Sequence, residues 1–521
     1  MTMKGLPLSI QTFADVITGN CVYVDKTQYL HSLLLPAKSA YFLSRPRRFG
    51  KSTTVTTLEA IFQGRKELFD GLFIATTDYA WPVHPVIRLD MKYASHPTVE
   101  RTEQGLTSLL EDVARIYQVA LTEPLVDDKL KQLIRLLREK TQQKVVVLID
   151  EYDKPLIDLL DDLPEAKKIQ GVLKRFYGVL KSADEHIRFA LITGVSKFTK
   201  VSVFSDLNHL SDLTMDTRYA ALCGYTQEEL ELYFVDWIAQ LAKTENKTKN
   251  ETLEKIKTWY NGYRLTKADI KVYNPWSTLH LFDKQSFEHH WFETGTPTFL
   301  VQAMKNQAFD LEILEQPVAD TDFSTYDIEK LQIVPLLFQT GYLTIKEYSP
   351  EWNRYLLDFP NQEVTWAFSS LLVADFAELP EGEASFIQLQ LLRALKDDDL
   401  MTFFSVINSL FAKIPAHLHD KKESYYHSIF IAACTMAGIP IEAENNTSMG
   451  RSDAVLQSST SIYVIELKMN QPADVALKQI ADKGYAECYQ YLNKQVISVG
   501  VSFDSQQRSI VEWKKKSAYQ G

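Results

Sequence analysis

The sequence predicts an α/β protein with three parts: a parallel-sheet core near the N-terminus, a helical, winged-helix-like connector, and a second α/β domain at the C-terminal end. Three observations predict this. A short apolar run, 41–44, leads into a basic loop and then a helix. A strongly apolar strand, 145–149, ends in two carboxylates. Near the C-terminus, two predicted strands bring an aspartate beside a Glu-x-Lys sequence.

Length and charge set the first limits. The chain has 521 residues, of which 45% are hydrophobic and 24% charged, which is typical of a folded soluble protein. We expect three domains, at 1–265, 266–390 and 391–521. The 67 acidic and 56 basic residues give a net charge of −11, which excludes a histone-like protein but not an enzyme with a locally basic groove. Four scattered cysteines argue against a disulfide scaffold or a contiguous zinc site.

The basic loop, R-P-R-R-F-G-K-S-T at 45–53, has the context of a phosphate-binding loop, because a strand precedes it and a helix follows. The free N–H groups of a helix N-terminus attract an anion. Lys51 would reach the β- and γ-phosphates and the Ser52 hydroxyl would ligate Mg²⁺. The loop departs from the usual pattern because Arg45 replaces its first glycine, and a basic turn before a helix is the alternative. The residues expected to contact nucleotide are Arg45, Arg48, Phe49, Gly50, Lys51, Ser52 and Thr53.

The strand at 145–149 has the composition of a central strand buried on both faces. Its carboxyl end carries Asp150 and Glu151, at the edge where open α/β sheets bind their ligands. We expect Asp150 to hold Mg²⁺ and Glu151 to polarise the water that attacks the γ-phosphate. The alternative is a strand that ends in a solvated acidic turn.

A third strand, 189–192, is expected between the other two, so that a polar residue at its end could sense the γ-phosphate. Thr193 is the first candidate and Ser196 the second, and a hydroxyl that caps the following turn is an equal alternative. Arg264, after the turn-forming Asn261 and Gly262, is a candidate second sensor. Its alternative is a surface arginine.

These segments together resemble the bacterial AAA-ATPase-like family. The similarity rests on Y-V-D-K-T at 23–27, R-P-R-R-F-G-K-S at 45–52 and L-I-D-E-Y-D-K-P at 148–155, and further on T-G-V-S-K-F at 193–198, F-S-D-L-N at 204–208 and C-G-Y-T at 223–226. The resemblance implies an ATP-binding domain in which arginine at the first glycine position is a family trait, and a C-terminal PD-(D/E)XK nuclease domain. AAA-type relatives often form rings with a trans arginine, which implies a homo-oligomer with candidates Arg47, Arg48 and Arg218.

The C-terminal region carries the pattern of a metal-dependent nuclease. A predicted β-hairpin places Asp453 beside Glu466 and Lys468, which share one face of their strand. Two carboxylates suit Mg²⁺, which prefers oxygen ligands, and a lysine ammonium stabilises charge on a phosphate. Alternating acidic and basic residues also occur on solvated strands, but this strand is largely apolar. We assign Asp453 and Glu466 to the metal.

Two flanking helices add candidates. Glu423 and His427 share a helix face upstream and either could assist the metal, although an acidic residue also suits an exposed helix start. Gln479 and Tyr485 follow the Glu-x-Lys strand. Such a Gln…Tyr pair is similar to that of recombination-type nucleases in the PD-(D/E)XK superfamily, which implies that Gln479 belongs to the catalytic set within about 415–515.

The sequence therefore favours an ATP-binding protein fused to a Mg²⁺-dependent nuclease that acts on nucleic acid, with DNA preferred to RNA. The alternatives are an NTPase switch whose nuclease-like domain binds without cleaving, and an interaction protein with relic sites.

Residues 391–521 hold as many basic as acidic residues, so the negative charge lies in 1–390. Without a signal-like start or about 18 successive apolar residues, we expect a cytoplasmic protein that spans no membrane.

Overall fold

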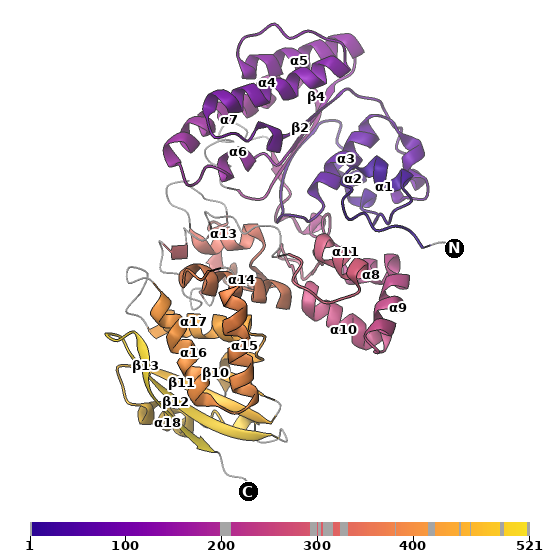
Figure 1. Cartoon of the computed structure of the whole chain (residues 1–521). Coiled ribbons are helices and arrows are strands. Elements are labelled where there is room, and N and C mark those ends of the chain that lie inside the picture. Colours follow the sequence, from indigo (N-terminus) through magenta and orange to yellow (C-terminus); the bar gives the residue numbers. More distant parts are fainter. Residues whose placement is uncertain are drawn as a thin grey trace. The chain divides into compact units, whose positions relative to one another are not determined.

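The computed structural model divides the chain into two compact units (Figure 1). Unit 1 comprises Met1–Thr294 and Pro317–Gln362, and unit 2 comprises Gly295–Gln316 and Glu363–Gly521. The three-domain division with boundaries at 265 and 390 stays a prediction. The structure describes residues 3–197, 210–291, 300, 304–305, 316–323, 332–380, 382–414, 423–447, 450–458, 460–489 and 494–517. The motif at 204–208 and Phe198 lie outside these described residues.

Unit 1 is built on a parallel sheet with the strand order β2-β3-β4-β1-β5. The strands are β1 (Ser39–Ser44), β2 (Val86–Asp90), β3 (Val145–Asp150), β4 (Ile187–Gly194) and β5 (Ser211–Asp212). The prediction that the strand ending at Thr193 lies between the other two is confirmed, because β4 pairs with both β1 and β3. The carboxyl ends of these three strands therefore meet at one edge of the sheet.

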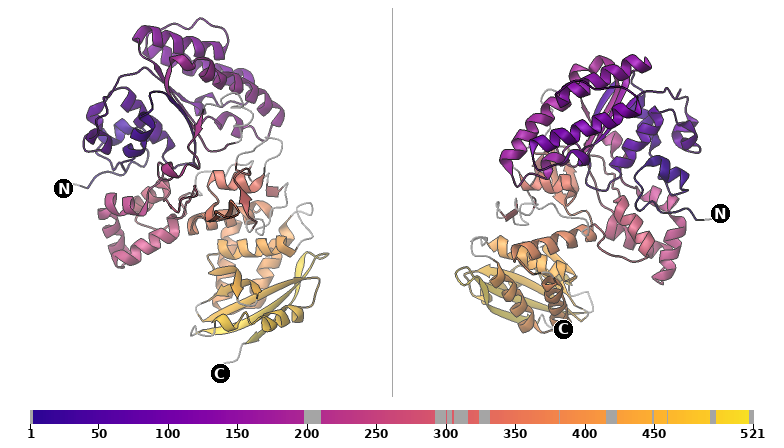
Figure 2. Two further views of the ribbon diagram at one scale, coloured as in Figure 1. Left: turned by 180° about the vertical axis from the view of Figure 1, so that it is seen from behind. Right: turned by 45° about the horizontal axis from the view of Figure 1, so that its top comes forward.

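Helices cover this sheet on both faces. Val145, Val147 and Ile149 of β3 join a core with helices α4, α5 and α7, while the alternating Val146 and Leu148 point to the face against which α3 packs. Figures 1 and 2 show α3 and α7 on opposite sides of the strands. All six residues of β3 are buried, as expected for a central strand. The helices are α1 (Phe13–Thr18), α2 (Thr27–Leu34), α3 (Lys51–Phe62), α4 (Val99–Ile116), α5 (Val126–Thr141), α6 (Lys154–Ile157) and α7 (Leu163–Ser182).

A helical segment follows the sheet in unit 1. Its first helix, α8, begins with a capping box, in which Thr226 and Glu229 cap the helix reciprocally. Pro275 occupies the first turn of α11, where its missing N–H costs nothing. The helices pack around an aromatic core that includes Phe234, Trp237 and Phe282. They are α8 (Gln227–Tyr233), α9 (Val235–Thr244), α10 (Lys249–Tyr260) and α11 (Pro275–Lys284).

Unit 1 ends in a helix and a small antiparallel sheet of order β6-β8-β7. Gly341, with φ of 94°, terminates the helix in the left-handed conformation that glycine favours, and a strand follows. The elements are α13 (Ile333–Thr340), β6 (Val318–Ala319), β7 (Thr344–Ser349) and β8 (Arg354–Asp358).

Unit 2 contains a mixed sheet of order β13-β12-β11-β10-β9. The predicted hairpin is present, since β10 and β11 are antiparallel and Ala454 pairs with Ile465. Helix α18 connects β11 to the parallel strand β12. The strands are β9 (Ile441–Thr447), β10 (Gly450–Gln457), β11 (Ser461–Met469), β12 (Gln495–Asp504) and β13 (Ser509–Ser517). The helices are α14 (Gln362–Phe376), α15 (Glu383–Lys396), α16 (Leu400–Lys413), α17 (Glu423–Met436) and α18 (Ala473–Asp482). Among the described residues, no helix combines the length and the apolar character needed to cross a bilayer.

Candidate nucleotide and nuclease sites

The basic loop between β1 and α3 wraps around the ammonium group of Lys51. Gly50 precedes α3 with φ of 89° and Arg48 also adopts a positive φ of 67°, so the chain turns tightly into the helix. Nζ of the buried Lys51 donates to the carbonyl oxygens of Arg45 at 2.9 Å and Pro46 at 2.8 Å. The loop thus presents a cation and the N-terminus of a twelve-residue helix at the same place, which suits a polyphosphate.

The Arg45 side chain anchors this loop through hydrogen bonds to backbone carbonyl oxygens. Its guanidinium is buried and donates to the carbonyl oxygens of Ser44 at 2.9 Å, Thr214 at 2.7 Å and Tyr219 at 3.1 Å. The side chain therefore points into the protein, although the Arg45 carbonyl contacts Lys51. The arginine at the first glycine position therefore anchors the loop to the segment that follows β5.

The other loop side chains pack against the helical segment. The Arg48 guanidinium lies 3.6 Å from the ring centroid of Trp276, a cation–π contact. Phe49 meets Tyr263 edge to face at 4.8 Å. The Arg264 guanidinium donates to the carbonyl oxygens of Thr266, Lys267 and Ala268, in its own turn. The structure does not bring Arg264 to the loop cavity, so its side chain stabilises the turn locally.

The carboxylates at the end of β3 are held by β4. Oδ1 of Asp150 accepts from the Thr193 hydroxyl at 2.5 Å and from the Glu151 amide at 3.1 Å. Glu151 adopts a positive φ of 53°, a strained conformation for a non-glycine residue. Burial raises the pKa of Glu151 and the ammonium of Lys51 opposes that rise. The proposed water-polarising carboxylate therefore lies within electrostatic reach of the loop lysine.

Asp153, which the sequence does not single out, fixes the connection between β3 and β4. Its buried carboxylate accepts from the Val195 amide at 3.1 Å, the Ser196 amide at 2.7 Å and the Ser196 hydroxyl at 2.7 Å. Ser196 is thus engaged structurally, whereas Thr193 contacts the proposed Mg²⁺ carboxylate. The role of Asp153 could not be predicted from neighbouring residues, because its partners lie more than 40 residues away. The motif D-E-Y-D was the sequence signal for it.

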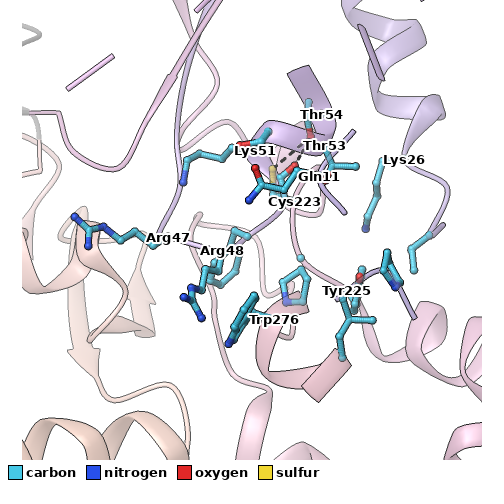
Figure 3. A pocket seen from close by; sticks show the side chains of 18 of the residues that line it. Gln11, Lys26, Arg47, Arg48, Lys51, Thr53, Thr54, Cys223, Tyr225 and Trp276 are labelled. Atoms are coloured by element: carbon cyan, nitrogen blue, oxygen red, sulfur yellow. Dashed lines mark hydrogen bonds between the residues drawn. The ribbon is translucent and has the colours of Figure 1, made fainter. Parts of the chain in front are cut away.

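A cavity of about 430 Å³ opens between the loop, the N-terminal segment and the helical segment (Figure 3). Its volume falls within the range of small-molecule sites. Of the predicted residues, Asp150, Thr193, Arg45 and Arg264 do not line it. Those that do are Arg48, Phe49, Gly50, Lys51, Ser52, Thr53 and Glu151. Further lining residues had no role predicted from the sequence, among them Gln11, Lys26, Cys223, Tyr225 and Trp276. The family motifs at 23–27 and 223–226, which contain Lys26, Cys223 and Tyr225, were the sequence signal for three of these residues.

The donor set at the loop fits Mg²⁺. Ser52 is a hydroxyl residue that lines the cavity, and Asp150 is a carboxylate at the carboxyl end of β3, which β4 separates from β1. Both are oxygen donors, which Mg²⁺ prefers. These residues would hold the ion beside the phosphates, as the sequence predicts.

Gly194, at the end of β4, leaves room for the side chains of Tyr152 and Asp153. A Cβ at this position would lie 2.4 Å from the Tyr152 ring and 2.7 Å from Oδ1 of Asp153. Gly194→Ala is therefore expected to lower the free energy of unfolding by about 1–3 kcal/mol through overpacking. Gly178→Ala is the control: nothing lies within 4 Å of its added Cβ inside α7, and it should gain about 0.5–1 kcal/mol. Denaturant titration measures both, and equal stabilities would contradict this packing.

The nuclease candidates converge at one end of the β10–β11 hairpin in unit 2. Oδ2 of Asp453 accepts from the Leu467 amide at 2.7 Å, which fixes it beside Glu466. Glu466 is fully buried, and its Oε1 accepts from Nζ of Lys468 at 3.0 Å and from the Gln479 amide nitrogen on α18. Its Oε2 is buried without a hydrogen-bond partner among the described residues. Glu466 therefore has an acceptor left for a ligand.

Charge at this cluster is strongly perturbed. Burial and the neighbouring Asp453 raise the pKa of Glu466 to about 7. For Lys468, burial lowers the pKa, but Glu466, Asp453 and Glu423 outweigh it and raise the pKa overall. Two carboxylates crowded together in a buried position favour the arrival of a cation.

Two side chains of the upstream helix α17, Glu423 and His427, contact the same strands. One oxygen of Glu423 accepts from the Met469 amide at 2.5 Å and the other lies 3.7 Å from Nζ of Lys468. The His427 ring nitrogen Nε2 lies 2.8 Å from the Asp453 carbonyl oxygen. Both residues brace the strands that carry the predicted set. Tyr485, the second member of the Gln…Tyr pair, lies in the core with Val455.

Asp453 and Glu466 fit Mg²⁺ by their chemistry and by the unpartnered Oε2 of Glu466. Within the described ranges, no three His, Cys, Asp or Glu side chains form a preformed metal site. Mg²⁺ commonly binds one or two carboxylates and completes its shell with water and substrate phosphate. Two carboxylates are therefore a sufficient protein contribution.

Known proteins match both parts of the chain. The model of the predicted AAA-ATPase family matches residues 7–204, and the model of the PD-(D/E)XK nuclease superfamily matches residues 421–513. An Azotobacter chroococcum mcd 1 protein, described as an uncharacterized protein in the vnfD 5′ region, is 37% identical over 527 residues, with 98% of each chain covered.

A search of solved structures aligns the Aeropyrum pernix ORC2 protein, solved as ADPNP–ADP complexes. The alignment has 11% identity and covers 65% of this chain and 87% of that one, but its TM-score of 0.26 is too low to support an argument. The family models and the full-length relative instead carry the assignment. The resemblance predicted from the motifs is confirmed: the chain belongs to the predicted AAA-ATPase family, and its C-terminal part matches the PD-(D/E)XK nuclease superfamily.

Proposed function

We propose that the protein binds and hydrolyses ATP at the Lys51 loop and cleaves nucleic-acid phosphodiester bonds at the Glu466 cluster, with DNA as substrate and the cytoplasm as its location. Glu466 carries the nuclease part of this proposal. Glu466 is a fully buried carboxylate with lysine and glutamine on one oxygen and, within the described part of the chain, no partner on the other, which differs from a solvated strand residue. DNA processing or defence against foreign DNA is the biological role that such a pair of activities fits.

At the loop, the chain's own residues would bind and orient the substrate. Lys51 would exchange its contacts to the loop carbonyls for the β- and γ-phosphate oxygens. Glu151 would orient the attacking water, and Thr193 would keep the Asp150 carboxylate in place through its hydroxyl. When bound, Mg²⁺ would neutralise phosphate charge beside Ser52 and Asp150.

At the nuclease cluster, Asp453 and Glu466 would hold Mg²⁺, which when bound polarises the scissile phosphate and acidifies a water ligand. Lys468 would place its ammonium against charge that develops on the phosphate. Gln479 would orient Glu466 through Oε1, and Glu423 would position Lys468 and the strand end. Each assignment uses a contact already present between the described residues.

The oligomer remains a prediction. Of the trans-arginine candidates, Arg48 lies on Trp276 and Arg218 pairs with Asp216 at 2.6 Å, while Arg47 lines the cavity.

A panel of substrates tests the proposal. The purified protein is incubated with single- and double-stranded DNA and RNA, with Mg²⁺ or with EDTA, and with or without ATP. Cleavage of DNA that requires Mg²⁺ is the expected result. ATP hydrolysis without cleavage of any substrate would instead favour a regulatory NTPase switch with a nuclease-like binding domain. The absence of both activities would favour an interaction protein with relic sites.

A further inference from the structure

A buried ion pair lies at the part of the cavity away from the phosphate loop. Lys26, at the start of α2, lines the cavity, and its Nζ lies 2.6 Å and 2.5 Å from the two carboxylate oxygens of Glu229 on α8. The two side chains are only 11% and 16% exposed. Figure 3 shows Lys26 near Tyr225 and separated from Lys51.

The two lysines have different hydrogen-bond partners at the cavity: Lys26 contacts Glu229, and Lys51 contacts the carbonyl oxygens of Arg45 and Pro46. Burial lowers the pKa of Lys51, opposed by Asp150, Glu151 and Asp153. Burial also lowers the pKa of Lys26, opposed by Glu229 and Asp25. Cys223 acts on both lysines, but no carboxylate does. A polyphosphate at Lys51 would therefore leave Lys26 to the remainder of a nucleotide.

Both members of the pair are fixed from outside the cavity. Asp25 accepts from the Thr27 amide at 2.8 Å and from the Phe73 amide at 2.7 Å, which holds the backbone beside Lys26. The carboxylate of Glu229 also accepts from the Thr226 amide at 2.8 Å, in the capping box of α8. The pair thus joins two segments 203 residues apart.

A buried ion pair contributes little net stability, because removing two charges from water offsets their attraction. A pair of well-packed apolar side chains would fill this part of the cavity lining equally well. The ammonium offers something an apolar side chain lacks: it has three N–H donors, and the Glu229 carboxylate engages two at most. One donor is left for an acceptor atom in the cavity.

We propose that Lys26, held by Glu229, is a specificity-determining residue that donates to an acceptor on the nucleoside part of the ligand and so distinguishes a nucleotide from a bare polyphosphate. The inference rests on the proposed binding of ATP and names the part of the ligand that this end of the cavity recognises. The aromatic side chains of Tyr225 and Trp276, which also line the cavity, suit the flat base of a nucleoside.

Calorimetry with two ligands tests this role in the presence of Mg²⁺: ATP and inorganic tripolyphosphate. Lys26→Met is expected to weaken ATP binding by about 10- to 100-fold while the affinity for tripolyphosphate stays that of the wild type. Glu229→Gln keeps a residue that completes the capping box but removes the anion. It should weaken ATP binding in the same direction, and the double variant should bind no more weakly than Lys26→Met, because the two groups act as one unit.

Lys38→Met is the matched control, since Lys38 pairs with Asp184 on the surface and does not line the cavity. Its affinities for both ligands should be unchanged. If Lys26→Met bound ATP as the wild type does, or lost both ligands equally, the specificity role would be overturned. A wild-type protein that bound neither ligand would instead overturn the proposed ATP site itself.

Discussion

Lys51→Ala is expected to lower the affinity for ATP by about 100-fold or more, because the variant loses the charge-assisted contacts to two phosphate groups. In the free protein Nζ of Lys51 already lies within the loop, held by the carbonyl oxygens of Arg45 and Pro46. The ammonium is therefore positioned before the ligand arrives, and little side-chain entropy remains to be lost on binding. Calorimetry with ATP and Mg²⁺ measures the loss.

Lys140→Ala provides a matched control for this variant. Lys140 also donates to two backbone carbonyl oxygens, those of Tyr117 at 2.8 Å and Gln118 at 3.3 Å, but it does not line the cavity. Both variants lose a lysine that braces a turn, so a general effect of that loss would appear in both. Only Lys51→Ala should lose ATP. Normal ATP binding by Lys51→Ala would mean that the loop is not the nucleotide site.

Short-range patterns predicted the elements that carry this site. The run 145–149 alone indicates a buried central strand, and Gly50-Lys51 after a strand indicates a phosphate loop, because both depend on neighbours in sequence. The orientation of Arg45 could not be predicted in this way. Its guanidinium is set by the carbonyl oxygens of Thr214 and Tyr219, about 170 residues further along the chain. The same applies to Lys26, whose partner Glu229 is 203 residues away.

In the nuclease cluster, too, some contacts could be predicted from neighbouring residues and others depend on how distant segments pack. Strand alternation places Glu466 and Lys468 on one face, and the hairpin brings Asp453 beside them, so these three follow from sequence. The contact between Gln479 and Glu466 depends on how α18 packs on β11, and the resemblance to a family supplied it. The unpartnered oxygen of Glu466, on which the metal proposal rests most directly, is visible only in three dimensions.

Glu466→Gln is expected to reduce Mg²⁺-dependent cleavage by about 1,000-fold, comparable to the loss of a central electrostatic group in other active sites. Glutamine is nearly isosteric with glutamate and can still contact Lys468 or Gln479, so the change removes charge with little change in packing. ATP binding should be unchanged, because the Lys51 loop belongs to unit 1 and this cluster to unit 2. A gel assay with the preferred nucleic acid, with Mg²⁺ and with EDTA, measures the rate.

The same variant should be more stable than the wild type when no metal is present. The pKa of Glu466 is raised to about 7 in the folded protein, so ionisation of this carboxyl opposes folding. The destabilisation begins as pH rises above the unfolded pKa of about 4.5 and is complete above the folded value. In EDTA, Glu466→Gln should therefore melt with the wild type near pH 4 and progressively higher as pH rises toward about 7.

Glu512→Gln provides the opposite case within the same unit. Contacts from the Ala473 amide and Lys514 lower the pKa of Glu512, so its ionised form supports folding above the unfolded pKa. Relative to the wild type, that variant should lose stability as pH rises toward the unfolded pKa of about 4.5 and stay less stable at higher pH, whereas Glu466→Gln gains stability between about 4.5 and 7. If Glu466→Gln melted below the wild type at pH 8 in EDTA, Glu466 would be a structural partner of Lys468. If it cleaved at the wild-type rate, the nuclease centre would lie elsewhere.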